Sequence, residues 1–344
     1  MNEETKPKTT AAVRILSLLT VILLAFWPMA ARASAATVVP VGRAVGIKLF
    51  SDGVVVVGTS EIVTENGKLN PARACGLREG DIITHINSTE VDTIEEVSAL
   101  LQELEGQKMS ISAIRENRTV HLTAHAVFCP EDHTYKLGAW IRDSMAGIGT
   151  VTFYCPETGA FGALGHGIND LDTALLMPLE SGSILPASVA GVRKGEVGSP
   201  GQLKGIFATE DTIGELTANT AEGIFGTMSK TDWFAGNTME TARRNEVRAG
   251  DATILSNISG DSVEEYDIRI LKVYPASTSG GGRDFLIQVT DQRLLDATGG
   301  IVQGMSGSPI IQNGKLVGAV THVMVDDPTS GYGIWVGNML EATK

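Results

Sequence analysis

The chain has 344 residues, of which 43% are hydrophobic and 19% charged, so a globally disordered protein is excluded and about two folded domains are expected. Asp and Glu outnumber Lys and Arg by 40 to 27 and no basic run occurs, so we expect no nucleic-acid partner. The three cysteines, Cys75, Cys129 and Cys155, include no C-x-x-C spacing. This argues against a disulfide framework or a zinc ribbon, although one bridge stays open.

The N-terminal segment has the pattern of an export signal. Basic residues ending with Arg14 precede the apolar run Ile15–Ala31, and small residues follow up to Ala33 and Ala35. We therefore predict that residues 1–35 are a signal peptide or a membrane anchor. The apolar run is short for a membrane span and contains a proline, which slightly favours cleavage over retention.

Residues 36–130 have a mixed pattern of strands and one helix. The continuous apolar run Val54–Val57 and the segment Ile82–Ile86 after a Gly-Asp turn are typical of strands. Thr93 with Glu96 three residues later forms a capping box, which predicts a helix that ends at Gly106.

A hairpin follows the helix, because apolar residues alternate on both sides of Glu116–Asn117. Together with the stretch Asn70–Ile83, this pattern resembles a PDZ domain. The resemblance implies that the module recognises peptide tails or partner proteins, or only positions a neighbouring domain. It also implies a short apolar loop that offers backbone N–H groups to a peptide carboxylate, formed by Val45, Gly46, Ile47, Lys48 and Leu49.

Residues 131–344 contain many short apolar runs separated by glycines and few helical stretches. Such runs include Ile148–Tyr154, Ala160–Leu164, Ile268–Tyr274 and Phe285–Thr290. This pattern predicts an all-β barrel or sandwich, with a soft boundary near residue 130.

The sharpest local signal is the motif Gly304-Met305-Ser306-Gly307-Ser308-Pro309, directly before a predicted hairpin. A glycine-flanked turn can expose the Ser306 hydroxyl and direct the N–H groups of Gly304 and Ser306 at an oxyanion. Ser308 is the rival nucleophile, disfavoured because proline follows it. The alternative interpretation of the motif is an ordinary turn that enters a hairpin.

A serine nucleophile needs a base, and His166 is the best candidate of the six histidines because glycines flank it after a short strand. His322 is a second candidate for the base, although the residues around it are more typical of a strand. No H-E-x-x-H motif and no dense ligand cluster occurs, so we expect neither a metal nor a cofactor.

The carboxylate that would orient the imidazole stays open from the pattern alone. Asp291 ends the predicted strand Phe285–Thr290, which is a sensible position for an inward carboxylate. The other candidates are Asp170, Asp172, Asp284, Asp326 and Asp327.

The whole chain resembles the SpoIVB peptidases, sporulation stage IV B serine peptidases of endospore-forming bacteria. The resemblance depends most on the segments Gly162–Gly167, Thr298–Pro309 and Asp327–Gly333. It implies a chymotrypsin-like double β-barrel with the catalytic residues His166, Asp291 and Ser306. Two departures from chymotrypsin-like enzymes are the replacement of Asp-Ser-Gly-Gly by Met305-Ser306-Gly307-Ser308 and the short distance in sequence between the aspartate and the serine.

The resemblance also implies a biological role. Peptidases of this family cross the inner forespore membrane into the intermembrane space, cleave themselves, and cut an inhibitory partner of an intramembrane protease to release a sigma factor. The expected partners are therefore that regulatory protein, the chain's own N-terminal segment and the membrane. The alternative is a non-catalytic PDZ adaptor that binds peptide tails at the outer membrane face.

Overall fold

The computed structural model describes residues 36–344 except 208–210, 235, 277–280 and 344, and Thr37–Lys344 form one compact unit. The predicted signal or anchor, residues 1–35, lies outside the described residues. The helices are α2 (Pro71–Cys75), α3 (Ile94–Leu104), α4 (Gln292–Thr298), α5 (Val336–Glu341) and the short 3-10 helices η1 (Thr231–Phe234) and η2 (Arg244–Glu246).

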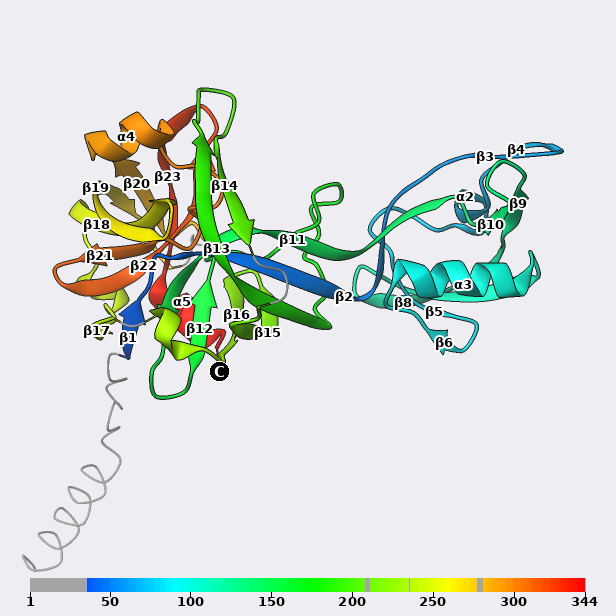
Figure 1. Ribbon diagram of the computed structural model, residues 1–344, viewed down its shortest axis with the longest axis horizontal. Coiled ribbons are helices and arrows are strands. Elements are labelled where there is room, and N and C mark those ends of the chain that lie inside the picture. Colours follow the sequence, from blue (N-terminus) through cyan, green and yellow to red (C-terminus); the bar gives the residue numbers. More distant parts are fainter. Residues whose placement is uncertain (1–35, 208–210, 235, 277–280, 344) are drawn as a thin grey trace, which may run out of the picture. The chain divides into compact units, whose positions relative to one another are not determined.

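Strands dominate the chain (Figure 1). The first twelve are β1 (Thr37–Pro40), β2 (Ala44–Thr59), β3 (Ile62–Thr64), β4 (Gly67–Leu69), β5 (Ile82–Ile86), β6 (Thr89–Glu90), β7 (Lys108–Arg115), β8 (Arg118–His125), β9 (Val127–Cys129), β10 (Thr134–Lys136), β11 (Ala139–Tyr154) and β12 (Ala160–Ala163). The others are β13 (Ser181–Arg193), β14 (Gln202–Phe207), β15 (Gly214–Thr220), β16 (Gly223–Met228), β17 (Met239–Glu240), β18 (Gly250–Ser259), β19 (Ser262–Val273), β20 (Phe285–Val289), β21 (Pro309–Gln312), β22 (Lys315–Met324) and β23 (Asp327–Trp335).

The C-terminal strands form a closed six-stranded barrel in the order β18-β19-β20-β23-β22-β21. Figure 1 shows these strands grouped together with α4. The pairing of Thr253 with Ile311 closes the barrel between β18 and β21. Alternate residues point inward and form its core, among them Ile254, Ile268, Ile287, Ile310 and Val320.

A second ring of six strands precedes this barrel in the sequence. The pairings run from β2 to β11, β12, β16, β15 and β13, and then return to β2, so this sheet also closes on itself. Each of the six strands contributes a buried residue to one core, namely Val45, Val151, Phe161, Ile184, Leu216 and Ile224. The predicted double β-barrel is therefore confirmed.

The far half of β2 and the elements β5, β7, β8, α2 and α3 form the mixed module predicted between the signal and the β-domain. The capping box of Thr93 and Glu96 is present at the start of α3, as predicted. The predicted turn at Glu116–Asn117 is also present, with φ values of 48° and 60°, which suit a tight hairpin turn.

The structure corrects the position of the predicted PDZ loop. Val45, Gly46, Ile47, Lys48 and Leu49 lie inside β2, where β11 pairs with one edge and β13 with the other. Both edges are occupied, so this segment cannot receive a peptide strand. The same pairings place β1 and the first half of β2 with the second β-ring, whereas the sequence assigned residues 36–130 to the PDZ module.

Within the described part of the chain, no helix is both long enough and apolar enough to span a membrane. The three cysteines, all of them described, are free thiols.

Candidate active site

Ser306 lies in the turn that leads from Val302 into β21, and two glycines allow the sharp bend. Gly304 and Gly307 have φ values of 98° and 99°, a region that side chains rarely adopt. The Ser306 hydroxyl donates a hydrogen bond of 2.8 Å to the carbonyl oxygen of Thr321 on β22. Ser308 is fully buried and bonds to the hydroxyl of Ser256 at 3.1 Å, so Ser306 is the accessible serine of the motif.

His166 follows β12, at the end of the second ring of strands. Its Nδ1 lies 2.8 Å from the carbonyl oxygen of Gly167, and a carbonyl can only accept, so Nδ1 carries the proton. The lone pair is therefore on Nε2, the nitrogen that serves as a base. Burial lowers the pKa of His166, which keeps the imidazole neutral near neutral pH.

Thr150 on β11 connects the serine turn to the segment that carries the histidine. Its backbone N–H donates to Ser306 at 3.2 Å and its hydroxyl donates to the carbonyl oxygen of Gly304 at 2.7 Å. Its own carbonyl accepts the N–H of Leu164 at 3.2 Å, two residues before His166. Thr150 has no exposed surface, so these three bonds form in a low dielectric.

These contacts bring the predicted nucleophile and base to one cavity of about 360 Å³, lined by His166, Gly304 and Ser306 among others. The backbone N–H groups of Gly304 and Ser306 have no acceptor in the part of the chain that the structure describes. Two unpaired donors beside a serine hydroxyl are what an oxyanion hole requires.

His322 lies on β22, as its sequence context predicted, and its ring centroid is 5.2 Å from that of His166. Its Nδ1 is buried and has no hydrogen-bond partner among the described residues. Burial, followed by the charges of His166 and Arg283, lowers the pKa of His322 to about 4. The second imidazole is therefore also neutral near neutral pH.

The structure does not bring Asp291 to His166, which corrects the expectation for the third catalytic residue. Asp291 is the N-cap of α4, and its carboxylate accepts hydrogen bonds from the backbone N–H of Arg293 at 2.9 Å and from a guanidinium N–H of Arg293 at 2.7 Å. The ion pair with Arg293 holds the pKa of Asp291 below its usual range. Local capping thus satisfies this carboxylate, because Arg293 follows it by only two residues.

Four of the other candidate carboxylates, Asp170, Asp172, Asp284 and Asp327, also have partners away from the imidazole. Asp170 pairs with Arg142, and Asp284 pairs with Arg244 and accepts the N–H of Trp335. Asp327 accepts hydrogen bonds from its own turn. In the described residues, the Gly167 carbonyl is therefore the group that orients His166.

Asn219 on β15 is a residue of the site that the sequence analysis did not select. Its Oδ1 accepts the N–H of Ile168 at 2.8 Å, and its Nδ2 donates to the carbonyls of Ile168 and Met177, each at 2.9 Å. It thereby closes the loop that follows His166. Asn219 is half-buried and stands in a mostly polar stretch of β15, so the local sequence carries no signal for this role.

Comparisons with known proteins identify the family of the chain and its PDZ domain. The family model described as SpoIVB peptidase S55 matches residues 133–340, and a PDZ domain model matches residues 68–115. A zinc metalloprotease, RasP of Shouchella clausii (strain KSM-K16), is 38% identical over 66 residues, which are 19% of this chain and 16% of the relative. The chain thus spans a small part of that relative.

Two solved structures are similar in part. The Rv3671c protease from M. tuberculosis in its active form is 15% identical, with a TM-score of 0.34 over 58% of this chain and 73% of the other. The PDZ domain of the SdrC-like protein from Listeria monocytogenes is 18% identical, with a TM-score of 0.21 over 26% of this chain and 87% of the other.

Proposed function

Since the chain belongs to the SpoIVB peptidase S55 family and carries a PDZ domain, it is a serine endopeptidase, and we propose that Ser306 and His166 perform its chemistry. The observation that carries this assignment is the cavity that both residues line together with Gly304. Nε2 of His166 accepts the Ser306 proton as Oγ attacks the substrate carbonyl, and the N–H groups of Gly304 and Ser306 stabilise the oxyanion.

The leaving amine then receives the proton from His166, and water hydrolyses the acyl-enzyme by the same path in reverse. The Ser306 hydroxyl donates to Thr321 in the structure, so the reaction begins when it turns toward the imidazole. The Gly167 carbonyl fixes the tautomer of His166 in the place where a carboxylate was expected.

The proposal extends to export, self-cleavage and a regulatory substrate. Family membership and the apolar segment Ile15–Ala31 with its small-residue sites support a protein that crosses or reaches a membrane. Its substrates are its own N-terminal segment and a membrane-associated regulator, whose cleavage activates a sigma factor in spore formation. The PDZ module would recognise peptide tails on such partners.

A fluorophosphonate probe tests the chemistry, because it reacts with an activated serine. We expect labelling of the wild type and none of Ser306→Ala, whereas Ser308→Ala, which removes the buried serine of the same motif, keeps it. A folded wild type that resists the probe would contradict the peptidase assignment and favour the non-catalytic adaptor.

Mass spectrometry of new N-termini tests self-cleavage. Purified wild type should acquire N-termini downstream of Ala35 over time, while Ser306→Ala stays intact. Identical processing of both proteins would assign the cleavage to another protease.

A further inference from the structure

The cavity beside Ser306 has an unusual lining for a protein as acidic as this one. None of the described residues that line it carries a charged side chain. Two apolar walls of the cavity matter here: Met145 and Ile148 on β11 form one, and Ile168 and Leu171 in the loop that follows His166 form the other. Ile47 and Leu164 add further apolar contacts.

Leu171 is the most exposed of the large hydrophobic residues described, with 86% of its surface accessible. A single exposed leucine is common on protein surfaces. Leu171 differs because it lies on the wall of the cavity that holds the reacting serine and because the backbone around it is firmly held.

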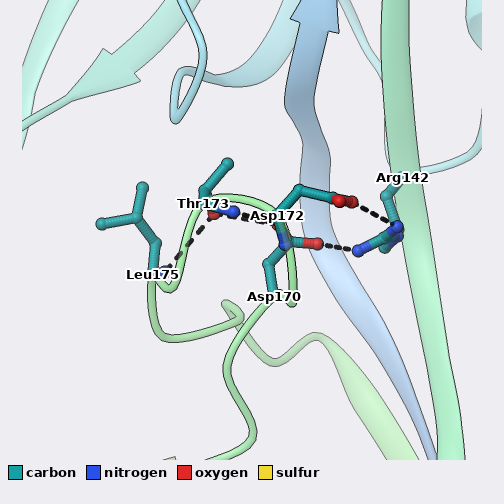
Figure 2. A network of polar contacts seen from close by, with 5 residues as sticks. All are labelled: Arg142, Asp170, Asp172, Thr173 and Leu175. Atoms are coloured by element: carbon teal, nitrogen blue, oxygen red, sulfur yellow. Dashed lines mark hydrogen bonds and ion pairs between the residues drawn. The ribbon is translucent and has the colours of Figure 1, made fainter.

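Figure 2 shows how that backbone is held. The two neighbours of Leu171, Asp170 and Asp172, both pair with the guanidinium of Arg142. The side chain of Asp170 is fully buried, and its second oxygen accepts three bonds from its own loop: the N–H of Asp172 at 3.1 Å, and the N–H and hydroxyl of Thr173 at 2.8 and 3.0 Å.

Arg142 lies on β11, the strand that also supplies Met145 and Ile148 to the cavity. The ion pairs therefore fix the two apolar walls relative to each other. A wall held in place before binding loses little conformational freedom when a ligand contacts it. The arrangement is that of a preformed binding site rather than of a chance exposure.

We propose that this cavity binds an uncharged, aliphatic side chain of the substrate polypeptide, at a position close to the scissile bond, and that Leu171 is a specificity-determining contact. The inference rests on the proposed function: attack by Ser306 requires the scissile carbonyl at its Oγ, so residues next to that carbonyl enter the cavity. A charged substrate side chain there would lose hydration and find no partner.

The test compares cleavage of a synthetic library of randomised peptides by the purified full chain. Wild type should cut before or after aliphatic residues at one position near the scissile bond. A pair of peptides that differ only there, Leu in one and Glu in the other, then gives a ratio of kcat/KM values within each variant. This ratio does not depend on the amount of active enzyme.

Leu171→Lys should lower the Leu-to-Glu ratio by about tenfold or more, the size of effect that one apolar contact produces in discrimination. Leu171→Asp should instead favour a Lys peptide over the Glu peptide. The matched control is Val197→Lys, because Val197 is 75% exposed and lies outside the cavity lining. The control should keep the wild-type ratio.

The outcomes separate this inference from the proposed function. Suppose that the fluorophosphonate labels Ser306. The inference alone is then overturned if the wild type shows no aliphatic preference, if it cuts no library peptide, or if Leu171→Lys has the same ratio as Val197→Lys. A chain that is not labelled overturns the proposed function.

Discussion

At the scale of single residues, the site depends on groups that face away from the substrate as much as on the reacting pair. Ser306 and His166 come from different barrels of the fold, and Thr150 binds to both of their segments. Its hydroxyl holds the carbonyl of Gly304, so it fixes the peptide plane next to the predicted oxyanion hole.

Thr150→Val removes this hydroxyl at nearly constant volume and leaves the Gly304 carbonyl buried without its partner. An unsatisfied buried group costs about 1–3 kcal/mol, so we expect a fall in kcat of about tenfold or more with little change in KM. Thr150→Ser keeps the donor and should recover most of the rate. Equal rates for the Val and Ser variants would show that the hydroxyl has no positioning role.

The pH dependence of the reaction should reflect the buried base. Because burial lowers the pKa of His166, the imidazole stays neutral below the ordinary histidine pKa of about 6.5, and activity should persist into that range before it falls at lower pH. The measurement is kcat/KM against pH on one peptide. An acid limb at or above about 6.5 would contradict a buried, neutral base.

At the scale of elements, the loop after His166 is held from two sides. Asn219 on β15 bonds to Ile168 and Met177, and Arg142 on β11 pairs with Asp170. The loop has no regular secondary structure over most of its length, so its shape depends on these side chains.

Asp170→Ala should loosen this loop strongly, because it leaves Arg142 without its buried partner and removes three hydrogen bonds. Breaking a buried ion pair costs about 3–5 kcal/mol. The matched control is Asp172→Ala, since the Asp172 side chain is 53% exposed and pairs with the same guanidinium. The control should cost less than about 1 kcal/mol.

Hydrogen exchange of residues in this loop, together with denaturant unfolding, measures both effects. Similar losses in the two variants would contradict the idea that the buried carboxylate of Asp170, rather than the charge of the loop, holds the wall of the cavity.

At the scale of the whole molecule, each of the two β-barrels contributes a partly buried histidine to the site, His166 from one and His322 from the other. The pKa of His322 is lowered to about 4, whereas an unfolded histidine titrates near about 6.5. Below about 6.5 the unfolded state binds more protons than the folded state, so protons favour unfolding there.

The free energy of unfolding should therefore carry no penalty from His322 above about pH 6.5, and it should fall as the pH drops toward about 4. His322→Asn, which removes this titration, should lose less stability over the same window. Tm measured for both proteins across that window checks the sign. A parallel decline in the two proteins would mean that other groups cause the acid sensitivity.

The local features of this protein follow from short stretches of its sequence. The capping box at Thr93, the Glu116–Asn117 turn and the glycine-flanked Ser306 are each set by residues within a few positions, and short-range sterics and hydrogen bonds decide them. The β-rich character of the second half followed in the same way from alternation and glycine spacing.

Which segments meet depends instead on how the whole chain folds. Val45–Leu49 has the apolar composition of a binding loop, but pairing on both edges makes it a barrel strand. Asp291 follows a predicted strand, which is a plausible position for an inward carboxylate, but Arg293 and the start of α4 take that carboxylate. Thr150 and Asn219 join segments far apart in the chain, and such contacts leave no short-range pattern, because they depend on how the sheets close.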